Sequence, residues 1–470
     1  MNSVINLNNP NPKCAPVEPT QNSTFVRQKA YLAVLRLLNL IIGERKYPDM
    51  LIGDLFKSGD FSSPEKAAIV ELVYVIQRHR GRIDHIIENA SSARISELDH
   101  SVLNILRICT FQAAFTEAST AGIINNAVAL SSNEKKLGGF VKRTVESVIR
   151  NKKRVSFPDK EEAPVGHISV YHSHPKWIVE KWLNELSGIQ EVEALCHAND
   201  LVPSLTIRAN PLKTDRSSLQ RLLEKEGYRS SPAVFSPYGA ALDKKEDIFK
   251  TEAFKTGFFE VQDEGSQLLA LLTNAKPEEL VIDACAGNGG KSIFLSGMMK
   301  NQGTLLAFET HSYKLANLRR RAAKAGASNI QTPQNIHEFD RMADCVFIDA
   351  PCSGMGVFRR NPDAKWRLTP NDVQELAAKQ KEIIKEYSRL VKPGGRLVYG
   401  TCTVSRQENE EVVSDFLGSN SDFYLIPASD VNPEIFGKFT SKEGFFRAMP
   451  HIHITDGFFG AVMQRRKIGF

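Results

Sequence analysis

Apolar residues recur at helical spacing through the first third of the chain. Within residues 30–41 they follow one another at steps of three and four, which places them on one face of a helix. The same spacing returns in 102–111 and 141–149, without the apolar–polar alternation of a strand. We therefore predict an all-helical N-terminal domain over residues 25–155, preceded by a disordered tail of residues 1–24.

The pattern becomes mixed after this domain. Residues 205–209 (LTIRA) are typical of a strand and lie between helical segments at 176–186 and 219–223, which predicts a small α+β module over 165–262. From 263 to 470, short apolar runs alternate with helical segments, as in a doubly wound α/β sheet. The predicted strands of this C-terminal domain are 280–284, 304–308, 345–349 and 395–399.

Composition narrows the class of protein. The 470 residues are 42% hydrophobic and 24% charged, which is ordinary for a folded domain protein. No apolar run reaches the roughly 18 residues of a membrane helix, so we expect no membrane partner. The net charge of +6 permits a nucleic-acid partner without requiring one. The 7 cysteines form no C-x-x-C pair and follow no secretory leader, so we expect a cytoplasmic protein. We also expect a monomer.

A glycine-rich turn follows the first predicted strand of the C-terminal domain. A phosphate-binding loop needs glycine five residues before the glycine of Gly-Lys-Ser, and Cys285 stands there instead. A dinucleotide fingerprint fits at Gly287 and Gly289 but has Ser292 in its third place. A third ligand, S-adenosylmethionine, needs a glycine turn without a pyrophosphate cradle. Glu309, about twenty residues on, can accept hydrogen bonds from ribose hydroxyls. The spacing predicts a nucleotide-type cofactor and leaves its identity open.

Two cysteines follow the ends of two predicted strands. Cys352 comes after the strand 345–349, and Cys402 after the strand 395–399. The carboxyl ends of such strands are where open α/β sheets bind ligands. A single free cysteine usually packs in a core, and we expect this of Cys14, Cys109, Cys196 and Cys345. We expect Cys285 to line the cofactor pocket. Because no further Cys or His stands at ligand spacing, we expect no metal.

A thiol next to a methyl donor suits a particular reaction. Carbon 5 of a pyrimidine is a poor nucleophile until a thiolate adds to carbon 6, after which carbon 5 can attack a sulfonium methyl group. An acidic group at ring nitrogen 3 stabilises the charge that this addition places on the ring. Asp349, three residues before Cys352, is the candidate for that group. A second thiol can assist the release of the product.

At these residues the chain resembles a known family. Asp-Ala-Pro-Cys-Ser-Gly at 349–354 and Gly-Thr-Cys-Thr-Val at 400–404 resemble the paired signatures of the RNA cytosine-5 methyltransferases. The chain is similar to the Sun/Fmu (RsmB) branch, which methylates small-subunit ribosomal RNA. The segments 174–177 and 207–210 resemble its middle module, and 124–128 its NusB-type RNA-binding domain.

This resemblance implies a three-part fold: a NusB-like helical domain, an α+β module, and a Rossmann-like S-adenosylmethionine-dependent methyltransferase domain. It implies that Cys402 is the nucleophile, that Cys352 assists release, and that Asp349 contacts base and cofactor. Where the family usually has an acid for the adenine end, this chain offers Asn335. The residues implied to hold S-adenosylmethionine are Cys285, Ala286, Gly287, Asn288, Gly289, Gly290, Lys291, Glu309, Asn335 and Asp349.

The substrate implied by the resemblance is RNA, with 16S ribosomal RNA favoured over transfer RNA or large-subunit RNA. A base in paired RNA must be flipped out or single-stranded before its carbon 5 is reached. Arg359, Arg360, Lys365 and Trp366 offer phosphate contacts and a stacking face, and we favour this interpretation over a solvated loop with an inward-packed Trp. Two other functions stay open: a non-catalytic RNA-binding assembly factor and an amino-group methyltransferase.

Overall fold

The chain divides into two compact units, Met1–Glu180 and Lys181–Phe470. The predicted tail of residues 1–24 lies outside the described residues. Among the residues that are described, no helix has both the length and the apolar character needed to cross a membrane. The structure, a computed structural model, describes residues 28–44, 46–132, 137–243 and 247–467.

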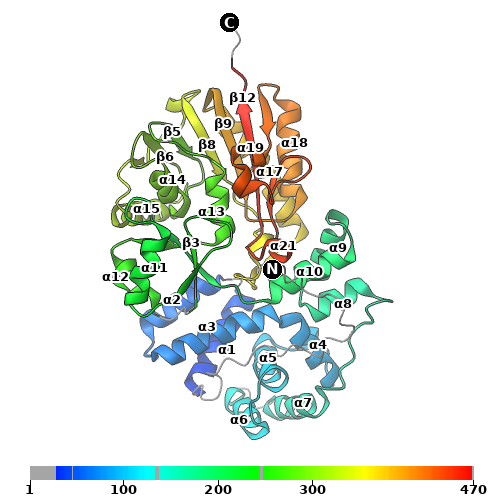
Figure 1. The fold of residues 1–470 in the computed structure, drawn as a ribbon. Coiled ribbons are helices and arrows are strands. Elements are labelled where there is room, and N and C mark those ends of the chain that lie inside the picture. Colours follow the sequence, from blue (N-terminus) through cyan, green and yellow to red (C-terminus); the bar gives the residue numbers. More distant parts are fainter. Residues whose placement is uncertain (1–27, 45, 133–136, 244–246, 468–470) are drawn as a thin grey trace, which may run out of the picture. The chain divides into compact units, whose positions relative to one another are not determined.

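The described part of the first unit is helical, which confirms the prediction of an all-α N-terminal part (Figure 1). Its helices share one core, in which Val34, Leu38, Val102 and Leu106 are fully buried, so the helical spacing of the sequence becomes the packing face. The helices are α1 (Gln28–Gly43), α2 (Pro48–Ser58), α3 (Ser63–Arg78), α4 (Arg80–Ala90), α5 (His100–Phe115), α6 (Thr120–Leu130), α7 (Gly138–Asn151) and α8 (Pro164–Tyr171), with a 3-10 turn η2 (Ile95–Glu97). Helix α9 (Lys176–Glu185) crosses the division between the units.

The second unit begins with a small α+β module, as predicted. Four antiparallel strands form a sheet in the order β2-β3-β1-β4. Ile207 of β1 and Leu219 and Leu223 of α11 are fully buried in its core, because alternation along the strand and helical spacing along the helix present their apolar sides to each other. The elements are α10 (Ile189–Asp200), β1 (Leu205–Ala209), α11 (Arg216–Lys225), β2 (Ser230–Pro232), β3 (Gly239–Leu242), η3 (Ile248–Lys250), α12 (Glu252–Lys255) and β4 (Phe259–Val261).

A larger mixed sheet follows, with the strand order β10-β12-β9-β8-β5-β6-β7 and β11 paired to β12. Strands β5 to β9 are parallel, whereas β12 runs antiparallel to β9. The predicted α/β class is thereby confirmed. The strands are β5 (Leu280–Asp283), β6 (Thr304–Ala307), β7 (Ile330–Gln331), β8 (Ala343–Asp349), β9 (Val391–Thr401), β10 (Phe423–Ile426), β11 (Phe446–Ala448) and β12 (Phe458–Arg465).

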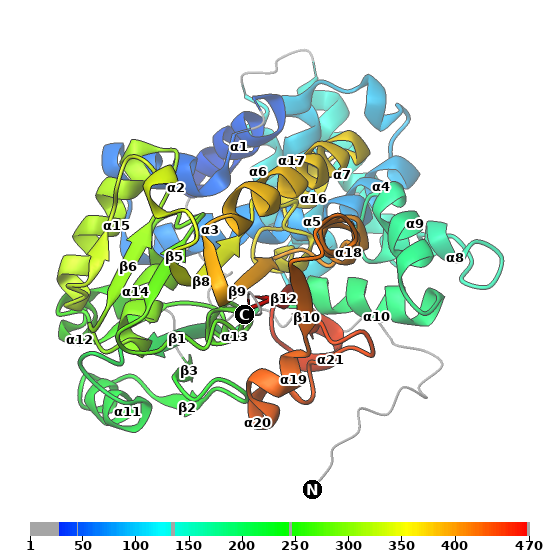
Figure 2. The ribbon, with the colours of Figure 1, turned by 90° about the horizontal axis from the view of Figure 1, so that it is seen from above.

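Helices cover both faces of this sheet. Helices α13 and α14 lie on one face and α17 and α18 on the other (Figure 2). The central strands are therefore apolar on both sides, which explains their short unbroken hydrophobic runs. The helices are α13 (Glu264–Leu271), α14 (Gly290–Met298), α15 (Ser312–Ala325), α16 (Ala364–Arg367), α17 (Pro370–Ser388), α18 (Glu410–Ser419), α19 (Ala428–Val431), α20 (Pro433–Phe436) and α21 (Pro450–His453), with 3-10 turns η4 (His337–Phe339), η5 (Met355–Val357) and η6 (Arg406–Glu408).

The topology points to one edge of the sheet. Strand β5 pairs with β6 on one side and with β8 on the other. After β5 the chain first forms β6 and β7 on one side of it and then crosses to form β8 on the other side, so the strand order reverses at β5. Ligands of open α/β sheets bind at the carboxyl ends of the strands beside such a switch point. Asp283, Asp349 and Thr401 are the last residues of β5, β8 and β9, and they mark this edge.

Candidate active site

The glycine turn links β5 to α14 at the carboxyl edge of the sheet. Gly287 and Gly289 have φ of +54° and +82°, a backbone conformation that glycine adopts without strain. A Cβ at Gly289 would lie 2.6 Å from the Leu318 side chain of α15, so a larger residue has no room there. Two arginines hold the turn from outside: Arg321 donates to the Asn288 carbonyl over 2.8 Å, and Arg208 to the Gly290 carbonyl over 3.0 Å.

Asp283, just before this turn, is buried and only partly satisfied. Its Oδ2 accepts a 2.7 Å hydrogen bond from the Ser292 hydroxyl. No donor among the described residues makes a well-aligned hydrogen bond to its Oδ1. Burial raises the pKa of Asp283 to about 7, and the nearby Asp349 adds to the rise, whereas Ser292 opposes it. The Cys285 backbone N–H also lowers the pKa of this carboxyl. A buried carboxylate oxygen without a well-aligned donor fits a cationic ligand group, and the ammonium of S-adenosylmethionine is one.

Some of the other predicted cofactor residues lie at the same edge of the sheet. Glu309 follows β6, and its carboxylate accepts from the backbone and ring of His311 at 3.0 and 2.8 Å. Burial favours the neutral form of Glu309, but these hydrogen bonds and Lys314 outweigh it and hold its pKa at about 2. Cys285 lies in the turn, and burial raises the pKa of its thiol. Asn335 is exposed in the segment after β7 and donates to Glu338 over 3.2 Å.

The structure brings the two predicted cysteines together. The sulfur atoms of Cys352, after β8, and Cys402, after β9, lie 3.4 Å apart, and both residues are partly exposed. The loops meet closely because Gly356 has no side chain. A Cβ there would lie 2.8 Å from the Cys402 carbonyl oxygen and 2.2 Å from that of Gly457. The hydrogen bond with Cys402, then burial, raises the pKa of Cys352. Either sulfur can donate in this contact.

Asp349 stands beside this pair and is joined to the glycine turn. Its Oδ2 lies 2.6 Å from the ammonium nitrogen of Lys291, the second residue of α14. Burial disfavours the charged form of Lys291, but the adjacent Asp349 carboxylate outweighs this and raises the pKa of Lys291. The ion pair therefore links the cofactor turn to the strand that ends before Cys352.

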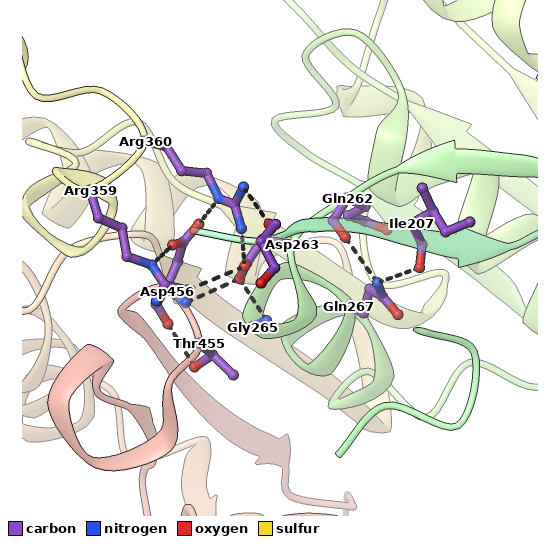
Figure 3. A network of polar contacts seen from close by, with 10 residues as sticks. Ile207, Gln262, Asp263, Gly265, Gln267, Arg359, Arg360, Thr455 and Asp456 are labelled. Carbon is purple, nitrogen blue, oxygen red and sulfur yellow. Dashed lines mark hydrogen bonds and ion pairs between the residues drawn. The ribbon is translucent and has the colours of Figure 1, made fainter. Parts of the chain in front are cut away.

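The segment after Cys352 contains the four residues predicted to contact RNA, and two of them, Arg359 and Arg360, are paired with carboxylates (Figure 3). Arg359 and Arg360 both bind the Asp456 carboxylate through their Nε atoms, and Arg360 Nη2 lies 2.7 Å from Asp263 Oδ2. Arg359 is 6% exposed and Lys365 1% exposed. The RNA contacts of the four residues stay a prediction. Because Arg359 and Lys365 are buried, direct contact of these two cations with phosphate is disfavoured.

This network has a structural role of its own. Asp456 is 1% exposed, and burial, together with Asp263, raises its pKa while the two arginines oppose the rise. The network ties the loop after Cys352 to the N-terminus of α13 and to the segment before β12 (Figure 3). Of the four predicted residues, Arg360 and Trp366 keep exposed surface that RNA could reach.

Sequence reasoning missed Asp283 and the buried Glu408, which accepts from Ser353 and Thr403 beside the two cysteines. It also missed Asp263 and Asp456, the two carboxylates that hold the arginines. Asp283 ends an apolar run directly before the glycine turn, and that position was the signal that could have found it. Asp456 is separated from its arginine partners by 96 and 97 positions, so no local pattern connects them. Within the described residues, no group of three or more His, Cys, Asp or Glu side chains gathers as metal ligands would.

The strand order, the glycine turn after the first parallel strand and the acid after the next strand define the class I fold of S-adenosylmethionine-dependent methyltransferases. The chain belongs to the RsmB/F family of this class. Residues 270–464 match the family described as 16S rRNA methyltransferase RsmB/F, 174–249 its ferredoxin-like domain, and 32–150 the NusB family. The predicted family and three-part fold are thus confirmed.

A bacterial relative and a solved structure each span nearly the whole chain. The probable ribosomal RNA small subunit methyltransferase B of Bacillus subtilis is 31% identical over 460 residues, which cover 94% of this chain and 99% of the relative. The crystal structure of PH0851 is 25% identical, with a TM-score of 0.78 over 94% of this chain and 99% of that one. A 28S rRNA (cytosine-C(5))-methyltransferase of Mus musculus is 30% identical over 319 residues, 63% of this chain and 40% of the relative.

Proposed function

We propose that this chain methylates carbon 5 of a cytosine in 16S ribosomal RNA, with S-adenosylmethionine as the methyl donor and Cys402 as the nucleophile. The observation that carries the proposal is the 3.4 Å approach of the Cys352 and Cys402 sulfurs at the edge that holds the glycine turn. The names of the Bacillus relative and of the mouse cytosine-C(5) relative support the RNA substrate and the position on the base.

The first step is the addition of the Cys402 thiolate to carbon 6 of the cytosine. This forms a C–S bond and moves electron density to carbon 5 and ring nitrogen 3. Asp349, in its protonated form, would donate to ring nitrogen 3, and Lys291, 2.6 Å away, is the cation that would supply that proton and balance the charge. Carbon 5 is then nucleophilic enough to take up a methyl group.

Cys352 is placed to complete the reaction. After methylation, carbon 5 must lose its proton so that the C–S bond can break and return the thiolate to Cys402. Carbon 5 is adjacent to carbon 6, and the Cys352 sulfur is adjacent to that of Cys402. The hydrogen bond with Cys402 is the main cause that raises the pKa of Cys352, and it weakens once Cys402 is a thioether. The partly exposed Cys352 can then lose its own proton to solvent and, as a thiolate, accept the proton from carbon 5.

The cofactor residues fit a sulfonium nucleoside. S-adenosylmethionine, when bound, supplies an electrophilic methyl group. The glycine turn, residues 285–291, would hold its methionine part, and Asp283 Oδ1 would accept from its ammonium group. Glu309, which stays ionised, would accept from the ribose hydroxyls, and Asn335 is the candidate for the adenine end.

The α+β module offers a surface for the RNA backbone. A hollow of about 480 Å³ there is lined by three cations, Lys213, Arg221 and Lys225, and by the ring of Phe258. Asp215, the acid in its lining, caps α11 through the backbone N–H of Ser218 at 2.8 Å. A positive hollow with an aromatic wall suits phosphates and an unpaired base.

Incubation of the protein with labelled S-adenosylmethionine and 16S RNA, free or in small-subunit particles, tests the proposal. The RNA is then digested and the labelled nucleoside identified. We expect label in 5-methylcytidine. Label in transfer RNA or large-subunit RNA alone would correct the substrate, and a methylated exocyclic amine would correct the chemistry. S-adenosylmethionine binding without any transfer would favour the RNA-binding assembly factor.

A further inference from the structure

One buried carboxylate contacts the residues that follow both active-site cysteines. Glu408 is fully buried, and its Oε1 accepts from the backbone N–H of Ser353 over 2.8 Å. Its Oε2 accepts from the Ser353 hydroxyl and, at 3.2 Å, from the Thr403 hydroxyl. Ser353 follows Cys352 and Thr403 follows Cys402, so a single side chain joins the two cysteine loops.

Neighbouring side chains strengthen this junction. The amide of Gln380, on α17, donates to Glu408 Oε1 over 3.1 Å and to the Pro351 carbonyl over 2.9 Å. The next residue, Asn409, accepts from the Thr401 hydroxyl at 2.6 Å and donates to the Thr403 carbonyl at 3.0 Å. The residues on both sides of Cys402 are therefore held from the segment 408–409, whereas Cys352 is flanked by Ser353, held by Glu408, and Pro351, held by Gln380.

The donors around Glu408 match a charged acceptor. An ionised carboxylate only accepts hydrogen bonds, and the Ser353 backbone, two hydroxyls and the Gln380 amide all point at it. Burial raises the pKa of Glu408, and these hydrogen bonds oppose that rise. A buried carboxylate that is fully hydrogen-bonded can fix loops rigidly, and it also places a negative charge near the pair of thiols.

We propose that Glu408 is a positioning residue that joins the two cysteine loops and gives the two thiols their different roles. Its negative charge favours the neutral thiol form of Cys352, which leaves Cys402 as the sulfur that receives the S–H hydrogen bond. The other ionisable groups that act on the two sulfurs are Tyr399, which acts on Cys352, and Lys291, which acts on Cys402. Lys291 is in turn acted on by Asp349 and Asp283. The role in catalysis rests on the proposed function, whereas the effect on the thiols does not.

Alkylation of Cys352 measures this charge without any RNA. The rate of iodoacetamide labelling at Cys352 is followed against pH by peptide mass spectrometry, in Cys402→Ser and in the double variant Cys402→Ser/Glu408→Gln. Removal of the negative charge favours the thiolate, so we expect the double variant to react about tenfold faster near pH 8 and its midpoint to move to lower pH. Glu410→Gln, in the same background, removes a charge that contacts neither cysteine loop and should change nothing.

Methyl transfer tests the positioning itself. Single-turnover transfer should fall about tenfold in Glu408→Gln, with S-adenosylmethionine binding unchanged. Thr403→Val removes the hydroxyl that contacts Glu408, Ser353 and the Ser405 backbone N–H but keeps the charge of Glu408. It should therefore slow transfer and leave the alkylation profile of Cys352 unchanged. Equal alkylation rates with and without Glu408, or wild-type transfer by Glu408→Gln, would overturn the proposal. A wild-type protein inactive on every RNA would instead overturn the proposed function, and the alkylation result would still stand.

Discussion

The sulfur atoms of Cys352 and Cys402 lie 3.4 Å apart although 50 positions separate them in the chain. Neighbouring parallel strands, β8 and β9, carry them to the same edge, and Gly356 lets their loops touch. Two thiols so close cannot act independently, since the charge of one sulfur changes the proton affinity of the other. The proposed function gives the two sulfurs two different roles, which the following substitutions separate.

The Cys402→Ser substitution should abolish methyl transfer. A hydroxyl adds to carbon 6 far more slowly than a thiolate, so the rate should fall by roughly a thousandfold or more. The measurement is single-turnover transfer of labelled methyl to RNA. Cys345→Ala, which changes a fully buried thiol within β8, is the matched control and should stay active. Full turnover by Cys402→Ser would exchange the roles that we assign to the two cysteines.

The Cys352→Ala substitution should trap the enzyme on its product. Without the second sulfur, the carbon 5 proton is removed slowly, and the C–S bond to Cys402 persists. We expect an RNA–protein adduct that survives a denaturing gel and disappears in the Cys352→Ala/Cys402→Ser double variant. If Cys352→Ala turns over freely and leaves no adduct, another group removes the proton.

Asp283 should make S-adenosylmethionine binding depend on pH. The raised pKa of about 7 means that roughly half of the free molecules carry this proton at neutrality. A bound ammonium favours the ionised carboxylate, so affinity should rise between about pH 6 and pH 8 with release of a proton. Asp283→Asn should bind about tenfold more weakly and without this dependence.

Isothermal titration calorimetry in buffers of different ionisation enthalpy measures that proton. Asp344→Asn is the control. It removes a carboxylate near the N-terminal end of β8, away from the carboxyl edge of the sheet, so proton release should persist. Identical proton release by wild type and Asp283→Asn would assign the titration to another group.

Charge reversal in the hollow of the α+β module should weaken RNA binding. Arg221→Glu with Lys225→Glu removes two cations that line it, so affinity should fall and the slope of log affinity against log salt should decrease by about 2. Lys276→Glu with Lys300→Glu makes the same change in charge outside the hollow and should affect binding less. The affinity for S-adenosylmethionine should be unchanged in the two double variants. If the two bind RNA equally well, the hollow does not contact the RNA.

Much of the C-terminal fold could be predicted because its signals are local. The strand 345–349 was predicted from a short apolar run and is observed as Ala343–Asp349, since a strand buried on both faces must be apolar throughout. The positions of Cys352 and Cys402 after strand ends followed from the same reasoning. Glu408 carried no such signal, because a lone acid near a helix start usually faces solvent.

What the sequence determined by itself was the kind of each element and the chemistry at the strand ends, because periodicity and turn residues act over a few positions. What only the tertiary structure decided was which side chains meet. Arg359 looked like a cation available to phosphate until Asp456, 97 positions away, proved to hold it in the interior. Burial of a charge requires a partner, and the fold chooses partners from distant parts of the chain.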